Sequence, residues 1–215
     1  MTEGKPIRTY RSQSRDATAG ETRRRLVEAA SGLLSEIDSL RAFSLEAVAR
    51  RAGVTRLTVY NQFGSRMGLM EAVFDRTAEA GGLFQLPEVF AMADPHAALA
   101  RVVAIFSGFW ASAPPALARL HAAGEIDPLV GEAVRVRNER RRLGLSALVG
   151  RLVKAGEIAP ERAGDLVDLL FALTSFAFHD QLRRDGRPAA AIAAMVEAQA
   201  KAAVALASDP RSAWP

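Results

Sequence analysis

The stretch that decides the fold is residues 44–69, SLEAVARRAGVTRLTVYNQFGSRMGL. It predicts two short helices joined by a tight turn. Ser44 is placed to cap the first helix, and Gly53 is placed to end it, because glycine adopts the left-handed conformation of a sharp helix stop without a steric penalty. Thr55 is placed to cap the second helix. Small residues in the first helix let the two helices approach closely.

Two longer helices are predicted on either side of this pair. Ser65 is placed to cap the later one, which ends at Gly81-Gly82. The earlier one begins at Glu21 and carries an apolar stripe with the spacing of an α-helix. Its stripe consists of Leu26, Ala30, Leu33, Leu34 and Ile37. Packed on this stripe, the short pair forms a helix-turn-helix, which presents its second helix to the major groove of DNA.

The second helix of the pair, with the helix ends around it, carries side chains suited to double-stranded DNA. An arginine fork fits guanine or a phosphate, a threonine or leucine fits thymine, and a tyrosine hydroxyl donates to a phosphate. Serines at helix N-termini bring backbone N–H groups to a phosphate. The predicted DNA-binding residues are Ser44, Thr55, Arg56, Leu57, Thr58, Tyr60, Asn61, Ser65 and Arg66.

Positive charge is concentrated in the first third of the chain. Residues 1–66 contain 12 Lys and Arg against 7 Asp and Glu, whereas the whole chain of 215 residues has a net charge of +4. This asymmetry indicates an anionic partner for the N-terminal part, nucleic acid before a membrane surface. Residues 1–20 are predicted to be a flexible basic arm that carries Lys5, Arg8, Arg11 and Arg15.

Residues 22–69 resemble the DNA-binding domain of the tetracycline-repressor (TetR) family of bacterial transcription regulators. The resemblance implies a homodimer with an N-terminal three-helix DNA reader and a larger helical effector domain. This chain departs from the family pattern at Leu57, where a small residue is usual, and at Arg66, where lysine is usual. The matching residues are Ala29-Ala30, Leu33-Leu34, Ser44, Val48-Ala49, Ala52-Gly53-Val54-Thr55, Thr58-Val59-Tyr60, Phe63, Ser65-Arg66 and Leu69.

The rest of the chain reads as long helices punctuated by proline and glycine. Residues 83–94 are predicted to be irregular. The fold class is therefore all-α with about nine helices, and the predicted domains are the arm (1–20), the helix-turn-helix domain (21–80) and a ligand-binding and dimerisation domain (81–215). The later helices are predicted at Pro95–Ser112, Pro115–Gly124, Pro128–Ala155, Pro160–Arg184 and Pro188–Ala207.

The last two predicted helices are suited to dimerisation. The helix at residues 160–184 is apolar on more than one face, which indicates burial on several sides. In residues 188–207, 11 of the 20 residues are alanine, and small side chains permit close helix packing. High helix propensity alone would also explain the alanines. The TetR resemblance implies that these helices pack with their symmetry mates as a four-helix bundle.

A small, largely apolar effector is predicted to bind within the second domain, because most of its aromatic residues lie in an interior for which no other use is evident. Plain core packing is an alternative role for each of these residues. The arginines of the helix at residues 128–155 are interpreted mainly as a solvated face, although Arg137 could anchor one carboxylate. The candidate pocket residues are Phe106, Phe109, Trp110, His121, Arg137, Phe171, Ser175, Phe178 and His179.

Several function classes have little support in the sequence. There is no cysteine, the three histidines are far apart, and the H-E-x-x-H, G-x-S-x-G, Walker and G-x-G-x-x-G motifs are absent. We therefore expect no enzymatic activity, no metal and no cofactor. The longest stretch without a charged residue, Val102 to Ala118, is 17 residues long and contains two prolines. We expect no membrane partner and a cytoplasmic location.

These patterns predict a ligand-responsive transcriptional regulator, more in keeping with a repressor than an activator. It would bind a palindromic DNA operator as a homodimer and be released by the effector. The alternative is a helical small-molecule-binding or scaffold module without sequence-specific DNA binding. A module of that kind would show no salt-sensitive affinity for DNA.

Overall fold

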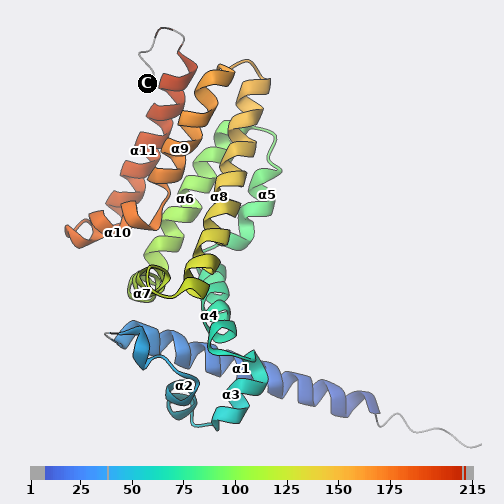
Figure 1. Cartoon of the computed structure of the whole chain (residues 1–215). Coiled ribbons are helices and arrows are strands. Elements are labelled where there is room, and N and C mark those ends of the chain that lie inside the picture. Colours follow the sequence, from blue (N-terminus) through green and yellow to red (C-terminus); the bar gives the residue numbers. More distant parts are fainter. Residues whose placement is uncertain (1–7, 38, 210, 212–215) are drawn as a thin grey trace, which may run out of the picture. The chain divides into compact units, whose positions relative to one another are not determined.

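The structure is a computed structural model that describes residues 8–37, 39–209 and 211. Within these residues the chain is all-α, as predicted, with eleven α-helices in place of the nine expected and no strand (Figure 1). It divides into two compact units, one up to Arg76 and one from Thr77 onward. The first unit contains α1 (Arg8–Glu36), the 3-10 helix η1 (Leu40–Ala42), α2 (Leu45–Ala52), α3 (Arg56–Phe63) and the start of α4 (Arg66–Ala80).

Helix α1 begins at Arg8, not at Glu21 as predicted, so residues 8–20 of the expected arm are helical. This could not be predicted from the sequence, because the segment lacks an apolar stripe. A helix that already exists gains one hydrogen bond for each residue it adds, so polar residues can extend it without packing. The rest of the predicted arm, including Lys5, lies outside the described residues.

The first unit is held together by apolar side chains from all four of its α-helices. Leu26, Ala30 and Leu34 of the predicted α1 stripe are buried, whereas Leu33 and Ile37 are half-buried. The remaining core residues come from the segment after α1 and from the three shorter helices. They include Phe43, Leu45, Val48, Ala49, Val59, Leu69, Met70 and Val73.

The second unit is a helical bundle. In Figure 1, α6, α8, α9 and α11 run side by side, and the packing pairs are α6 with α8 and α11, and α9 with α8 and α11. Helix α7 turns away from α6 by 94°. The helices of this unit are η2 (Leu83–Gln85), α5 (Leu86–Phe90), α6 (Pro95–Ser112), α7 (Pro114–Gly124), α8 (Pro128–Lys154), η3 (Pro160–Arg162), α9 (Ala163–Leu173), α10 (Phe176–Arg184) and α11 (Ala189–Ser208).

Two predictions for this unit were wrong. Residues 83–94 are not wholly irregular, because η2 and α5 lie within them. The single helix predicted at residues 160–184 is three elements, η3, α9 and α10. The break between α9 and α10 follows from Ser175, which has an extended backbone (φ −79°, ψ 155°) and accepts a hydrogen bond from the Phe178 N–H. A serine cap at this position starts a new helix in a new direction.

Among the described residues, α11 is the only individual helix that is long and apolar enough to cross a membrane, by length and composition alone. The bent pair of α6 and α7 meets the same criteria taken together. The helix itself was predicted from the sequence, but Glu197 and Lys201 interrupt its apolar run, so it was not predicted as a segment of this kind. Only 22% of its most apolar 18-residue window is buried, so much apolar surface on this helix has no neighbour within the chain.

Gly81 allows the end of α4 to pack on α6. A Cβ atom at Gly81 would lie 2.7 Å from the Cα atom of Phe109, which is too close for any real contact. We therefore expect Gly81→Ala to destabilise the protein by about 1–3 kcal/mol, the usual range for overpacking. The matched control is Gly108→Ala, where a Cβ atom would meet nothing within 4 Å.

Because alanine is favoured over glycine within a helix, the control should be neutral or stabilising by up to about 1 kcal/mol. Urea unfolding of both variants measures the difference. Equal stabilities of the two variants would contradict the packing argument.

Candidate functional site

The turn between α2 and α3 is built as the sequence predicted. The Ser44 hydroxyl accepts a hydrogen bond from the Ala47 N–H at 3.1 Å, and α2 ends at Gly53, whose φ of +67° is left-handed. The Thr55 hydroxyl accepts from the Thr58 N–H at 3.1 Å and caps α3. Ser65 caps α4 by accepting from the Gly68 N–H at 3.0 Å. These caps fix the direction of α3 relative to α2 and α4.

Helix α3 is anchored on one side and open on the other. Val59 is completely buried, whereas the side chains of Leu57 and Tyr60 are 65% and 53% exposed. Arg56 and Asn61 are also exposed. Thr58 is half-buried, and its hydroxyl lies 2.9 Å from that of Thr55. Large apolar and aromatic side chains on an open face are costly to leave in water, which is typical of a binding surface.

Arg56 is paired with a residue that sequence reasoning missed. Its Nε atom lies 2.7 Å from a carboxylate oxygen of Glu46 on α2. Both side chains are more than half exposed, so the pair adds little stability. Its effect is to orient the guanidinium and to offset its charge at the predicted DNA surface. The spacing of ten residues across a turn gives no helical-face signal, so the sequence alone could not show it.

Several arginines of the first unit hold the helices together. Arg23 of α1 lies over the Phe63 ring at 4.5 Å and donates to the Gln62 carbonyl at 2.8 Å. Arg25 of α1 donates to the Ala52 carbonyl at 3.2 Å. The guanidinium of Arg51 forms two hydrogen bonds with the Glu36 carboxylate. The positive charge that predicted an anionic partner is therefore partly used within the unit.

Arg66, which the sequence predicts as a phosphate contact, also contacts the protein itself. It is half-buried, and its Nη2 atom donates to the Leu40 carbonyl at 3.1 Å. This contact ties the start of α4 to η1. The guanidinium has a structural partner before any DNA is considered, and a role in DNA binding stays a prediction for Arg66.

The second unit gathers most of the predicted pocket aromatics at the α6, α7 and α10 helices. The Trp110 ring lies 4.4 Å from the Phe109 ring and 5.7 Å from the His121 ring, measured between centroids. His121 stacks on Phe176 at 4.2 Å. The Trp110 indole N–H donates to the Thr174 carbonyl at 2.8 Å, at the break between α9 and α10.

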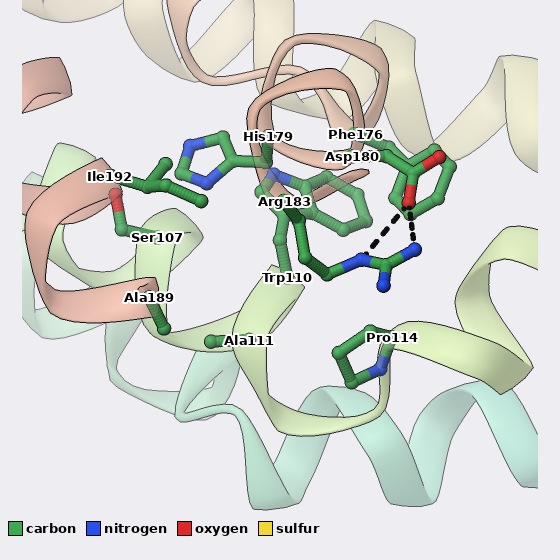
Figure 2. A pocket seen from close by; sticks show the side chains of 10 residues that line it. All are labelled: Ser107, Trp110, Ala111, Pro114, Phe176, His179, Asp180, Arg183, Ala189 and Ile192. Carbon is green, nitrogen blue, oxygen red and sulfur yellow. Dashed lines mark hydrogen bonds and ion pairs between the residues drawn. The ribbon is translucent and has the colours of Figure 1, made fainter. Parts of the chain in front are cut away.

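A small cavity of about 60 Å³ opens beside Trp110 (Figure 2). Two of the predicted pocket residues line it, Trp110 and His179. The buried Ser107 hydroxyl and the buried His179 Nε2 atom have no hydrogen-bond partner among the described residues. Asp180 faces Arg183 there, at 2.7 Å. The full lining is Ser107, Trp110, Ala111, Pro114, Phe176, His179, Asp180, Arg183, Ala189 and Ile192.

The other predicted pocket residues lie elsewhere. Arg137 is half-buried and donates to the Ala133 carbonyl of its own helix. Ser175 is the cap of α10, Phe178 contacts His179 edge to face, and Phe171 lies under two arginines of α8. Phe106 and Phe109 are core residues of α6.

A larger cavity of about 280 Å³ lies between α6, α9 and α11, and none of the predicted residues lines it. Its walls are mainly apolar, with Leu99, Val103, Leu170 and Val204 among them. The charged groups at its edge, such as Lys201, are exposed.

Sequence reasoning missed Arg141, the one buried arginine of the described chain. It was included among the solvated arginines of its helix. A signal was available, because Arg141 stands on the apolar stripe of α8, at helical spacing from three buried leucines. Those leucines are Leu145, Leu148 and Leu152.

Two histidines in this region are held neutral. Burial, with a smaller contribution from the charge of Arg141, lowers the pKa of His121 to about 4, while Asp180 opposes the shift. Burial also lowers the pKa of His179 to about 4, again with a contribution from Arg141. At neutral pH neither histidine therefore adds a positive charge to the interior.

Comparison with known proteins identifies the class of this fold. Residues 26–73 match the sequence profile of the bacterial regulatory proteins of the tetR family. A Mesorhizobium loti protein assigned to the TetR family of transcriptional regulators is 17% identical, with a TM-score of 0.65 over 87% of this chain and 97% of that one. A Rhodococcus transcriptional regulator is 22% identical, with a TM-score of 0.62 over 86% and 95% of the two chains.

A third similar structure is a Saccharomonospora viridis protein, described as a transcriptional regulator in complex with choline. It is 17% identical, with a TM-score of 0.67 over 85% of this chain and 96% of that one. No curated protein matches the chain in sequence. The chain therefore contains a segment, residues 26–73, that matches the TetR-family profile, and over most of its length it shares the fold of these similar structures.

The cap of α3 can be tested by substitution. We expect Thr55→Ala to destabilise the first unit by about 1 kcal/mol, because the Thr58 N–H loses its acceptor at the helix start. Thr55→Ser keeps the hydroxyl and should retain most of the stability. Thermal unfolding without DNA measures both variants. A Thr55→Ala variant as stable as wild type would show that the cap contributes nothing.

The lowered pKa values of His121 and His179 predict a loss of stability in acid. Because their pKa is lower in the folded chain than in the unfolded one, the unfolded state binds more protons between about pH 6.5 and pH 4. The contribution of each neutral histidine to stability is therefore fully present above about pH 6.5. The free energy of unfolding falls by up to about 3 kcal/mol for each histidine on acidification to pH 4. His121→Phe should make this fall shallower. Unfolding midpoints measured across this range test it, and an unchanged slope in the variant would contradict it.

Proposed function

We propose that the protein is a ligand-responsive transcriptional repressor, rather than an enzyme, that binds a palindromic operator in the cytoplasm as a homodimer. Residues 21–80 would read DNA, and residues 81–215 would bind the effector and dimerise. The observation that carries the proposal is the open face of α3, with Leu57 and Tyr60 exposed on a helix whose other side is anchored by Val59. Such a helix is suited to the major groove.

The apolar surface of α9 and α11 supports a homodimer. These two helices pack on each other, yet Leu169 of α9 and Leu206 of α11 are 41% and 54% exposed. Much of α11 is unburied alanine, which permits close approach of a second helix. A dimer provides two copies of α3, and successive major grooves on one side of DNA are about 34–36 Å apart.

The interior of the second unit supports a small-molecule effector. The cavity beside Trp110 combines apolar walls with polar groups that have no partner among the described residues, which is typical of a ligand site. The similar structure from Saccharomonospora viridis is a complex with choline, so a small organic effector is in keeping with this fold.

Release of DNA requires only a modest preference of the effector for the unbound state. An effector that binds the DNA-free arrangement about tenfold more tightly shifts the equilibrium by about 1.4 kcal/mol. A few buried contacts are enough to supply that difference.

The proposal is tested by selecting binding sites from a random duplex library with the full chain. We expect a palindromic consensus, and affinity that falls steeply with salt concentration because phosphate contacts release counterions. Sedimentation of the complex should show two chains for each duplex. Binding that is absent, or insensitive to both sequence and salt, would favour the helical module without specific DNA binding.

Two substitutions separate base reading from phosphate contact. Arg56→Ala should lower operator affinity by about 1–3 kcal/mol and change the preferred base at one position of each half-site. Tyr60→Phe should weaken all sequences alike, since phosphate contacts carry no sequence information. The control is Glu46→Gln, which breaks the Arg56 ion pair but keeps the arginine. An Arg56→Ala variant with the wild-type consensus would show that Arg56 reads no base.

A further inference from the structure

Arg141 is a buried cation that forms no ion pair with an anion among the described residues. Its side chain is 6% exposed, and no carboxylate among the described residues forms an ion pair with it. Its Nη1 atom donates to the Thr174 hydroxyl at 3.2 Å, and its Nη2 atom lies 3.4 Å from the Asn138 side-chain oxygen. The Nε–H has no acceptor among the described residues. The neighbouring Arg142, by contrast, is paired with Asp168.

The charge of Arg141 persists despite its burial. Desolvation, with a smaller contribution from Arg142, lowers the pKa of Arg141 to about 10, so the guanidinium remains protonated at neutral pH. A buried charge is costly unless it is paired and fully hydrogen-bonded. In the isolated chain that cost is offset only by neutral acceptors and by two aromatic rings, those of Phe171 at 4.1 Å and Phe106 at 5.6 Å.

Arg141 is linked to the cavity of Figure 2 through Thr174. The Thr174 hydroxyl accepts from Arg141, and the Thr174 carbonyl accepts from Trp110, which lines the cavity. The one carboxylate on the cavity wall, Asp180, already pairs with Arg183 and Arg184. No negative charge on that wall is left to serve Arg141.

We propose that the effector site is centred on Arg141 and takes a molecule with one carboxylate and an apolar body. This inference rests on the proposed function and names its effector class. A carboxylate meets the unpaired Nε–H edge of the guanidinium in the planar geometry that arginine recognises. One guanidinium offsets one negative charge, and His121 and His179 are neutral there, so the site favours a monoanion. The rings of Phe106, Phe171 and Trp110 supply apolar contacts for the body.

Arg141, Phe106 and Phe171 do not line the cavity as it stands. The cavity must therefore both widen and extend toward Arg141 to admit such a molecule, since about 60 Å³ holds little more than the carboxylate group. Helix α10 provides the movable wall. It carries Phe176 and His179 of the lining, and it is bounded by the break at Ser175 and by Gly186, whose φ is +83°.

The test uses probes matched in shape that differ in the head group, an anionic carboxylate against a neutral amide. Benzoate and hexanoate are compared with benzamide and hexanamide by thermal unfolding of the full chain without DNA. We expect the carboxylates to raise the unfolding midpoint of wild type and to bind at least tenfold more tightly than their amides. Arg141→Met should lose this preference, because it keeps an apolar stem of similar length without the charge. Arg140→Met, which removes an exposed arginine on the same helix, should keep it.

A second measurement does not depend on any probe. Without ligand, Arg141→Met should be at least as stable as wild type, because it removes an uncompensated buried charge.

A third variant separates charge from geometry. Arg141→Lys retains the charge without the planar fork and should bind carboxylates more weakly than wild type but more tightly than Arg141→Met. The inference is wrong if wild type responds no more to carboxylates than to amides, if Arg141→Met responds as wild type does, or if Arg141→Met is less stable than Arg140→Met.

These outcomes are separable from those of the proposed function. Operator selection with the same wild-type protein reports DNA binding directly. Specific DNA binding without a carboxylate response would overturn the inference and leave the regulator intact. A carboxylate response at Arg141 that leaves operator affinity unchanged would support the binding site and overturn the effector role.

Discussion

Thr174 is the point on which the second unit depends. This residue is completely buried at the end of α9, and it receives hydrogen bonds from two other helices, from Trp110 of α6 and from Arg141 of α8. Its hydroxyl in turn donates to the Leu170 carbonyl. Because the chain turns into α10 at the next residue, the same contacts that join the bundle also place Phe176 and His179 beside Trp110. Bundle packing and cavity shape are therefore set together.

The first unit depends on a constraint of another kind. Its two short helices are stopped and started by backbone geometry, through the left-handed Gly53 and the hydroxyl caps of Ser44 and Thr55. A helix cap depends only on residues that lie within a few positions of one another, so caps can be predicted from the local sequence. For this reason the sequence predicted the turn and the start of each of these two helices. It also predicted the separation of Val59 from the exposed Leu57 and Tyr60, which follows from helical periodicity.

Contacts between distant segments were not open to the same reasoning. The pairing of Arg56 with Glu46 and the ring contact of Arg23 with Phe63 depend on where helices cross. The helical state of residues 8–20 was missed because a polar helix extension carries no apolar period. Of the aromatic residues expected in the interior of the second unit, Phe106, Phe109 and Trp110 are buried, whereas Phe171, Phe176 and Phe178 are half-buried. Which of them line a cavity was beyond reach, because cavities depend on small gaps between packed helices.

The two units use arginine in opposite ways, and this difference bears on function. In the first unit, arginines are exposed or hydrogen-bonded to carbonyls and carboxylates, so their charge is largely satisfied or solvated. Arg141 in the second unit is buried, and no carboxylate among the described residues pairs with it. Replacing a buried charge by an apolar residue is often neutral or stabilising, so the hydrogen bond from Arg141 to Thr174 does not by itself account for a charge there. A ligand that brings the missing negative charge does account for it.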